Sequence, residues 1–481
     1  MFEKLTESIY INGQWKAVNE QQTDTVYNPA TLQPITKVAN GGREEAEEAI
    51  HAAAKAFPSW SEMPGRKRSR ILYKASELMT AEAERLGRIL TSEQGKPLKE
   101  AIGEVKGAAA FLLWYAEEAS RGYGEWLPSS VKSKRMLVIP KPVGVVGAIT
   151  PWNFPSSMIT RKLGPALAAG CTIVLKPSEE TPLSAVEIIK IFEKSGMPQG
   201  VVNMVTGDAQ QIGNAMLTNK EVRLITFTGS TAVGKYLMRE SSEHVKKLSL
   251  ELGGHAPSIV FKDADIEKAA QLVLASKFRN NGQTCICTNR LFVHESIAEQ
   301  FTDALKEKVE KMKVGAGMEE STELGPLINK AASDKVHSHM EDAVDKGAKV
   351  ISGGGFWKGK LNGHFYNPTI LSNINDDMKI MNEETFGPII PLQTFNDEDE
   401  VIQKANDTDY GLAAYVFTEN TNQAIKASEK LDYGIIGVND VFPAMPEAPF
   451  GGMKQSGIGK EGGHHGMAEF LEEKYISIGI E

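Results

Sequence analysis

The sequence predicts an α/β protein with more than one domain. After residue 142, short β-branched segments alternate with helical segments, and a second alternating region extends from Ser258 to about Gly437. Alternation at this spacing is typical of βαβ units and a parallel sheet. The chain has 481 residues, and at roughly 150 residues per domain this length corresponds to about three domains.

A helical part comes before the first alternating region. Residues 43–120 are predicted to be mostly helical, because apolar side chains between Arg66 and Glu93 recur at the spacing of one helix face. Residues 132–141 have the pattern of a strand with a basic edge. The strands expected next are 143–150, 172–176, 201–205 and 224–228, and the helices are 163–169, 182–195 and 209–217. Ser178 and Asp208 are predicted to cap the last two helices.

The second alternating region predicts another α/β unit. Its expected strands are 258–261, 291–294, 349–351, 389–395, 414–418 and 434–438, and its expected helices are 266–278 and 297–312. Gly253 and Gly254 mark the expected boundary between the two units. Residues 468–479 predict the end of a helix followed by a strand. No low-complexity linker separates these parts, so we expect the domains to pack closely.

Composition excludes several classes of protein. Hydrophobic residues make up 41% and charged residues 24% of the chain, which is typical of a globular protein. The net charge of −9 gives no support for nucleic-acid binding. The longest apolar runs are far shorter than the ~18 residues of a membrane span, and the N-terminal segment has no apolar signal-peptide core. We therefore expect a soluble cytoplasmic enzyme or binding protein.

The cysteines indicate a reducing compartment and one candidate nucleophile. Cys171, Cys285 and Cys287 are too few for a disulfide framework. No CxxC or HExxH pattern is present, so no metal site is expected. Cys285 lies in the polar segment NNGQTCICTNR, where a thiolate could be useful, although most isolated cysteines are packing residues.

Glu251 is the preferred candidate for a general base. It lies in an apolar strand (LSLELGG), and an apolar environment raises a carboxyl pKa towards a useful value. A structurally paired glutamate is the alternative. His337 and His339 alternate in a charged helix and are expected at the surface.

The segment 224–236 (LITFTGSTAVGKY) contains GxxxxGK, which is close to a Walker A motif. Tyr236 stands where that motif needs Ser or Thr, so an ATPase is excluded. What remains is a helix start at Gly229 and Ser230. It either accepts a phosphate through backbone N–H groups or is an ordinary strand–turn–helix.

A second strand end carries charged residues. In the segment 171–182 (CTIVLKPSEETP), Lys176 and Glu179 follow a buried strand. Ligands of open α/β sheets lie at the carboxyl ends of strands, so these side chains could contact a ribose. The alternative is a solvated helix start whose acids favour the helix dipole.

Seven motifs occur in one order along the chain. They are PWNFP (151–155), KPSEETP (176–182), FTGS (227–230), LELGG (250–254), GQTC (282–285), EETFGP (383–388) and PFGGMKQSGIGKEGG (449–463). In this order and spacing, the chain resembles the aldehyde dehydrogenase superfamily over nearly its whole length. The resemblance implies a Rossmann-type NAD(P)-binding domain (1–122 and 142–252), an α/β catalytic domain (253–435) and a β oligomerisation and bridging element (123–141 and 436–481).

The resemblance also implies roles for matching residues. Cys285 would be the nucleophile, Glu251 the general base, and Asn153 the side-chain donor of the oxyanion hole. Thiolate attack on an aldehyde gives an alkoxide that needs preorganised donors, and the thioester left after hydride transfer to the nicotinamide needs an activated water. The implied cofactor-binding residues are Thr150, Pro151, Trp152, Lys176, Ser178, Glu179, Gly229, Ser230, Leu252, Glu384 and Phe386.

Among these residues, Lys176 and Glu179 would hold the adenosine ribose, Ser230 would meet the pyrophosphate, and Glu384 would bind the nicotinamide ribose, with Phe386 against the ring. NAD is the expected cofactor because Glu179 would repel a 2′-phosphate. NADP is the alternative, since Lys176 could pair with that phosphate.

Two stretches most resemble succinate-semialdehyde dehydrogenases: 158–171 (MITRKLGPALAAGC) and 277–290 (KFRNNGQTCICTNR). The resemblance implies that Arg161, Arg279 and Phe450 bind the substrate and that the arginines hold its distal carboxylate, which suits a guanidinium fork. Either arginine could instead be a structural ion-pair partner. The loop 441–448 (VFPAMPEA) lacks the serine often found there. Succinate semialdehyde is therefore expected first, with glutarate semialdehyde, another ω-carboxy aldehyde or an aliphatic aldehyde as alternatives.

Other readings of the chain remain less favoured. A CoA-acylating enzyme needs no water activator, and an inactive binding protein needs neither Cys285 nor Glu251, yet both residues are present. Unpaired strand edges in the oligomerisation element would be exposed pairing surfaces, so a homodimer or homotetramer is expected. Cys287 is either a packing residue or a thiol that resolves an oxidised Cys285.

Overall fold

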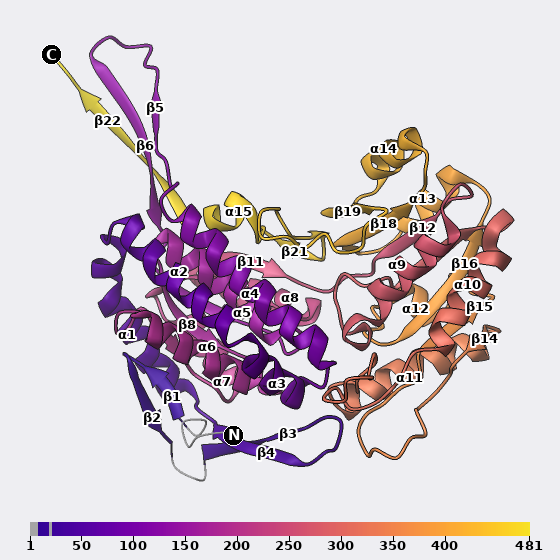
Figure 1. Cartoon of the computed structure of the whole chain (residues 1–481). Helices are drawn as coiled ribbons and strands as arrows, with labels where there is room; N and C mark the ends of the chain where they lie inside the picture. Colours follow the sequence, from indigo (N-terminus) through magenta and orange to yellow (C-terminus); the bar gives the residue numbers. More distant parts are fainter. Residues whose placement is uncertain (1–7, 19–21) are drawn as a thin grey trace.

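The computed structural model describes residues 8–18 and 22–481. Residues 1–7 and 19–21 lie outside that part. They include the start of the expected NAD(P)-binding domain and the start of the N-terminal segment in which no signal peptide is expected. Two lobes form around two large sheets, and an arm of three strands projects from the first lobe (Figure 1). The α/β class predicted from the sequence is confirmed. Among the helices that the structure describes, none is long and apolar enough to cross a membrane.

The first lobe is built on an eight-stranded sheet. Its strand order is β2 (Gln14–Ala17), β1 (Ser8–Ile11), β9 (Val202–Met204), β8 (Thr172–Lys176), β7 (Val145–Ile149), β10 (Val222–Thr228), β11 (Lys247–Glu251) and β21 (Gly457–Ile458). The strands from β9 to β11 are parallel, and β1 and β21 join antiparallel at the two sides. The expected βαβ organisation is therefore present.

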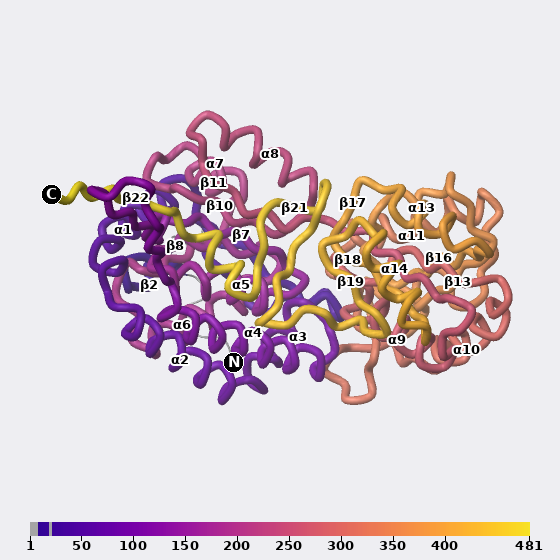
Figure 2. The backbone as a smooth tube through the Cα atoms, turned by 90° about the horizontal axis from the view of Figure 1, so that it is seen from above, coloured from indigo at the N-terminus to yellow at the C-terminus, as the bar shows by residue number. Residues whose placement is uncertain are grey.

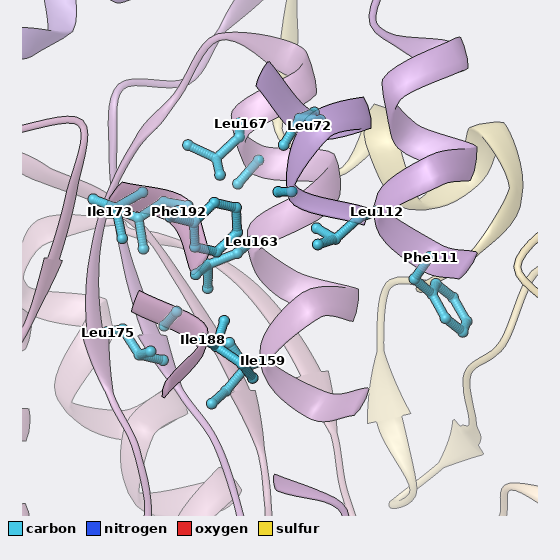
Figure 3. Close-up of a cluster of buried hydrophobic side chains, with 14 of the residues drawn as sticks. Leu72, Phe111, Leu112, Ile159, Leu163, Leu167, Ile173, Leu175, Ile188 and Phe192 are labelled. Carbon is cyan, nitrogen blue, oxygen red and sulfur yellow. The ribbon is translucent and has the colours of Figure 1, made fainter. Parts of the chain in front are cut away.

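Helices cover both faces of this sheet. One face carries α2 (Gly65–Ala81), α3 (Ala83–Gln94), α4 (Leu98–Glu118), α5 (Pro155–Ala169) and α6 (Pro182–Ser195), and the other carries α1 (Arg43–Ser61), α7 (Ala209–Thr218) and α8 (Thr231–Ser241). Strand β8 supplies both cores, because its side chains alternate: Ile173 and Leu175 pack towards α5 and α6, and Val174 packs towards α1 and α7. Figure 3 shows Leu163 of α5 and Phe192 of α6 beside Ile173 and Leu175.

The second lobe contains a seven-stranded sheet. Its order is β14 (Lys349–Ser352), β15 (Thr369–Ser372), β16 (Ile389–Phe395), β13 (Arg290–His294), β12 (Pro257–Val260), β18 (Ala413–Phe417) and β19 (Ile435–Val438). Its helices are α9 (Ile266–Phe278), α10 (Ala298–Glu310), α11 (Lys330–Asp345), α12 (Lys379–Asn382), α13 (Glu398–Asn406) and α14 (Thr421–Lys430). The change of sheet between β11 and β12 lies at the glycine pair that the sequence marks as a boundary.

The arm consists of β5 (Glu125–Leu127), β6 (Lys134–Pro142) and β22 (Leu471–Gly479), all antiparallel. Before β22, the chain returns to both lobes: β19 lies in the second sheet, β20 (Met453–Lys454) pairs with β17 (Tyr410–Gly411), β21 lies in the first sheet, and α15 (Gly463–Ala468) follows. Figure 2 shows this C-terminal segment running across both lobes. A separate hairpin joins β3 (Thr23–Tyr27) and β4 (Pro34–Ala39).

One of the two predicted helix caps is wrong. Asp208 caps α7 by accepting a backbone N–H, as expected. Ser178 does not cap α6: its hydroxyl accepts the Glu180 N–H in a turn, and the helix begins at Pro182. Proline suits a first helical position because it has no N–H to satisfy. The next N–H groups of α6 donate to the buried carboxylate of Glu93, which comes from α3.

Replacing Leu163 tests the core beneath α5. Leu163 is fully buried, so Leu163→Ala is expected to lower the free energy of unfolding by about 2–5 kcal/mol through lost burial and a residual cavity. Leu113 on α4 is 37% exposed, and Leu113→Ala should change it by less than about 0.5 kcal/mol. Urea unfolding of both variants beside the parent measures the difference. Equal losses would contradict this assignment of the core.

Candidate active site

The strand order of the first lobe creates a crevice for a ligand. From β7 the chain continues through β8 and β9 on one side, and then returns to β10 and β11 on the other side. Ligands of open α/β sheets bind at such a reversal, outside the carboxyl ends of the strands. The residues expected to bind the cofactor follow these ends. They are Thr150, Pro151 and Trp152 after β7, Lys176, Ser178 and Glu179 after β8, Gly229 and Ser230 after β10, and Leu252 after β11.

Polar groups in this crevice fit a dinucleotide. Thr150 and Thr228 each have a buried hydroxyl oxygen without a hydrogen-bond partner in the described part of the chain. Lys176 is buried, and its Nζ lies 2.5 Å from Oε1 of the half-exposed Glu179. Burial lowers the pKa of Lys176, and the nearby Glu179 partly opposes this effect. Unpaired hydroxyl groups, an ammonium group and a carboxylate are the donors and acceptors that ribose and phosphate groups need.

The start of α8 leaves backbone N–H groups near the same crevice. Ser230 is the N-cap residue, and its Oγ accepts the Val233 N–H at 3.3 Å. A Cβ atom at Gly229 would lie only 2.4 Å from the ring of Phe227, so the close turn requires glycine. A helix N-terminus favours an anion through its dipole and free N–H groups.

The second lobe contributes Glu384 and Phe386. Glu384 is partly buried, its Oε1 accepts the Gly254 N–H at 3.0 Å, and burial raises its pKa to about 7. Phe386 has a left-handed backbone conformation with φ of 56°, and its ring packs edge-on against Trp152 at 5.6 Å between centroids. Trp152, which follows β7 in the first lobe, and Phe386 of the second lobe are thus in contact.

The predicted surface position of His339 is wrong. Its side chain is buried, with Nδ1 at 3.3 Å from Thr385 Oγ1 and Nε2 at 3.3 Å from a Glu383 carboxylate oxygen. These two partners lie on either side of Glu384 in the chain. Helical periodicity carries a signal for this burial, because His339 lies three residues after the buried Val336 and four before the buried Ala343.

Cys285 lines a cavity of about 760 Å³. It lies in the loop between α9 and β13 and is partly accessible, whereas Cys171 and Cys287 are buried. Burial raises the pKa of the Cys285 thiol, and Glu384 acts in the same direction. The Cys287 sulfur lies 3.4 Å from the Gly282 carbonyl oxygen and 3.9 Å from Lys277 Nζ, in a packed position behind the loop.

Asn153 connects the end of β7 to the loop of Cys285. Its Nδ2 donates to the Gln283 carbonyl at 3.0 Å, and its Oδ1 accepts the Phe154 N–H at 3.1 Å. These contacts fix the orientation of the amide and leave the second Nδ2 hydrogen available.

Glu251 ends β11 in a buried position. Its Oε2 has no hydrogen-bond partner among the described residues, and burial, followed by the charge of Glu461, raises its pKa well above the usual range. Burial also acts to raise the pKa of Glu461, but Lys162 and Arg161 outweigh burial and keep that pKa below its usual value. Lys162 Nζ and Arg161 Nε lie 2.7 and 2.8 Å from the Glu461 carboxylate. Sequence reasoning missed Glu461 and Lys162, although both lie in quoted motifs.

The two predicted substrate arginines have different surroundings. Both line the cavity. Arg161 pairs with Glu461 and lies 4.0 Å over the ring of Phe450. Arg279 lies 4.9 Å over the ring of Phe154, and no described carboxylate forms an ion pair with it. Arg279 therefore keeps a guanidinium group available to a ligand, whereas Arg161 already has a carboxylate partner.

The loop 441–448 contributes apolar side chains to the same cavity. Phe442 and Met445 line it and are 47% and 54% exposed. Their exposure places them at its mouth, where they present apolar surface to an entering ligand.

Comparisons with known proteins agree with this geometry. The family model described as "Aldehyde dehydrogenase family" matches residues 15–476. The mitochondrial succinate-semialdehyde dehydrogenase of Arabidopsis thaliana is 50% identical over 98% of this chain and 88% of its own length. The glutarate-semialdehyde dehydrogenase of Pseudomonas putida is 47% identical over 98% of both chains. The succinate-semialdehyde dehydrogenase [NADP(+)] of Escherichia coli is 46% identical over 98% of this chain and 97% of its own.

A solved structure has the same fold. The crystal structure of succinate-semialdehyde dehydrogenase from Burkholderia pseudomallei superposes with a TM-score of 0.97 at 46% identity, covering 100% of this chain and 99% of that one. A family model that spans nearly the whole chain, together with relatives of such identity and coverage, identifies the chain as a member of the aldehyde dehydrogenase family.

Proposed function

We propose that this protein oxidises succinate semialdehyde to succinate with NAD(P)⁺ through a covalent intermediate on Cys285. The observation that carries the proposal is one cavity lined by both Cys285 and Arg279, whose guanidinium group has no ion pair within the described part of the chain. A thiol beside a cation suits a substrate with an aldehyde at one end and a carboxylate at the other.

The proposed chemistry uses Cys285 in the cavity, Asn153, which contacts the loop of Cys285, and Glu251, whose charge acts on the Cys285 thiol. Attack of the Cys285 thiolate on the aldehyde carbon gives a tetrahedral alkoxide, which accepts hydrogen bonds from the Asn153 amide and the Cys285 backbone N–H. Bound NAD⁺ or NADP⁺ would supply the hydride acceptor. Glu251 then removes a proton from the water that hydrolyses the thioester, a role suited to a buried carboxylate with a raised pKa.

The cofactor would lie across the crevice at the strand ends. We assign the adenosine ribose to Lys176 and Glu179, with Ser178 beside them, and the pyrophosphate to the helix start at Gly229 and Ser230. We assign the nicotinamide half to these further residues: Thr150, Pro151, Trp152, Leu252, Glu384 and Phe386. The unpaired hydroxyl of Thr150 supports this assignment.

Succinate semialdehyde is the first choice because of the charge at the cavity. Arg279 would bind the distal carboxylate, while Arg161, held by Glu461 and Phe450, shapes the wall and adds positive potential. Glutarate semialdehyde is the alternative, since a relative named for that substrate is 47% identical, and Phe442 and Met445 would also tolerate an aliphatic aldehyde. A CoA-acylating enzyme is disfavoured because Glu251 is present.

Each of the proposed domains is assigned its own role. We assign cofactor binding to 1–122 and 142–252, catalysis to 253–435, and oligomerisation together with bridging between the lobes to 123–141 and 436–481. The arm carries large exposed apolar side chains, including Trp126 at 64% and Tyr475 at 55% exposure. Such surface on edge strands favours a homodimer or homotetramer. We propose a cytoplasmic location.

Two substitutions separate the proposed catalytic steps. Cys285→Ala is expected to abolish turnover. Glu251→Gln should still form one equivalent of NADH per site in a rapid burst, with little steady-state turnover, because acylation precedes water activation. In the parent, the steady-state rate should rise with pH as Glu251, whose pKa is raised, loses its proton. Stopped-flow absorbance at 340 nm measures both phases. Full steady-state turnover by Glu251→Gln would remove Glu251 from the proposed mechanism.

Arg279→Leu tests recognition of the substrate carboxylate. This change is expected to cost roughly 2–4 kcal/mol of transition-state binding for succinate semialdehyde, as for other buried charge-assisted contacts. Butanal, which has the same chain length but no carboxylate, should lose much less. The comparison uses kcat/KM for both aldehydes with parent and variant. Equal losses for the two aldehydes would assign Arg279 a structural role.

Cofactor preference depends on the pair formed by Lys176 and Glu179. The carboxylate is expected to accept a hydrogen bond from a free 2′-hydroxyl and to repel a 2′-phosphate, so kcat/KM should be higher with NAD than with NADP. Glu179→Gln removes the repulsion and leaves Lys176 available, and should shift the ratio towards NADP. Steady-state kinetics with both cofactors measures this ratio. A parent enzyme that prefers NADP would overturn the assignment.

A further inference from the structure

Lys96 is a fully buried lysine in direct contact with the backbone of Asn153. Its ammonium group donates to the Asn153 carbonyl oxygen at 2.7 Å and to Glu104 Oε2 at 2.6 Å, and both charged side chains are almost completely enclosed. The Lys96 Nζ also lies 3.9 Å from the centre of the Phe154 ring. The cation is therefore fixed on three sides beside the residue that we assign to the oxyanion hole.

Glu104 fixes the segment that follows Asn153. The N-cap position of α5 is Phe154, which has no side-chain acceptor. Glu104 Oε1 supplies the missing acceptor and accepts the N–H groups of Ser156 and Ser157 at 2.9 and 3.2 Å. Because its other oxygen binds Lys96, one carboxylate joins the cap of α5 to the cation at Asn153.

The network continues into the loop of the nucleophile. Asn280 Nδ2 donates to the Asn153 carbonyl at 2.8 Å and to the Gln283 carbonyl at 3.3 Å. The same Gln283 carbonyl accepts the side-chain amide of Asn153. Gln283 lies two residues before Cys285. The hydrogen-bond network around Lys96 therefore connects both parts of the proposed oxyanion hole, the Asn153 amide and the Cys285 backbone N–H.

The hydrogen bonds at Asn153 form a chain with one direction. The Lys96 ammonium group donates to the Asn153 carbonyl, whose peptide unit contains the Phe154 N–H. That N–H donates to Asn153 Oδ1 in the same side chain whose Nδ2 is the proposed donor to the alkoxide. Each bond withdraws electron density from the next amide, and hydrogen bonds in such chains strengthen one another in a low-dielectric interior.

We propose that Lys96 is a positioning residue for the oxyanion hole, which orients Asn153 and polarises its side-chain amide through two consecutive amide groups. This inference rests on the proposed function, because it takes the Asn153 amide as the donor to the alkoxide. The cap of α5 accounts for Glu104 but requires no cation, and a buried ion pair is by itself weak evidence for stability.

The experiment measures acylation of Cys285 without the cofactor. Ester cleavage of p-nitrophenyl acetate passes through a tetrahedral oxyanion on the same thiol, and release of p-nitrophenolate reports its rate. Lys96→Met is expected to lower this rate at least tenfold, with the KM for NAD in aldehyde oxidation unchanged. Lys96→Gln, which keeps a donor and loses the charge, should give an intermediate rate and serves if the methionine variant does not fold.

A double-mutant cycle separates the proposed role from general destabilisation. If Lys96 acts through Asn153, the change Lys96→Met in an Asn153→Ala background should alter the acylation rate less than twofold. The same tenfold loss in both backgrounds, or no loss in the parent background, would overturn the proposal.

Lys246→Met is the matched control. Lys246 is also buried and donates to two backbone carbonyls, those of Asn219 and Val222, on a different part of the first lobe. This variant should acylate at the parental rate, and a loss as large as that of Lys96→Met would contradict the inference. Aldehyde oxidation by the parent protein tests the proposed function separately. If the parent protein is acylated by the ester but oxidises no aldehyde, the proposed function is refuted. The double-mutant cycle at Lys96 is then judged by the rate of ester cleavage alone.

Discussion

The parallel order of β8, β7, β10 and β11 is the constraint on which the rest of the site depends. Parallel strands end at the same edge of a sheet, so segments separated by up to about a hundred residues are brought together there without any specific contact between them. The end of β11 carries Glu251, and the turn that follows β7 carries Asn153. The second lobe needs to add only one loop with Cys285 and one with Glu384 to complete the arrangement.

Local sequence patterns predicted the elements that depend on local energies. Helices α6 and α9 and strands β8 and β16 have the bounds that periodicity gives, and Asp208 caps α7 as expected. The error at Ser178 arises where a distant residue takes over a local role, because Glu93 replaces it at the start of α6. His339 differs, because its helical spacing with the buried Val336 and Ala343 already indicates burial.

The candidate site shows the same limit. Motif order predicted Cys285, Glu251 and the strand-end residues, because each belongs to a short segment with its own chemistry. The buried partners of these residues were missed: Glu461 from the C-terminal segment and Lys96 from the connection between α3 and α4 have no local signal of a role. Partner contacts also distinguish the two arginines, which the sequence treats alike. Arg161 is bound to Glu461, whereas Arg279 has no ion-pair partner among the described residues.

The contrast between two buried glutamates supports the assignment of the base. Glu251 and Glu461 interact electrostatically in one enclosed cluster, where two neighbouring carboxylates cannot both ionise at low cost. Lys162 and Arg161 contact Glu461 and keep its pKa low, so the negative charge of the cluster resides there. That charge, added to burial, raises the pKa of Glu251, which keeps a free oxygen. When their environments push the pKa values of two titratable groups apart, the difference indicates which role each group takes. The ionised Glu461 is the fixed member of the pair, and Glu251 is the one able to exchange a proton.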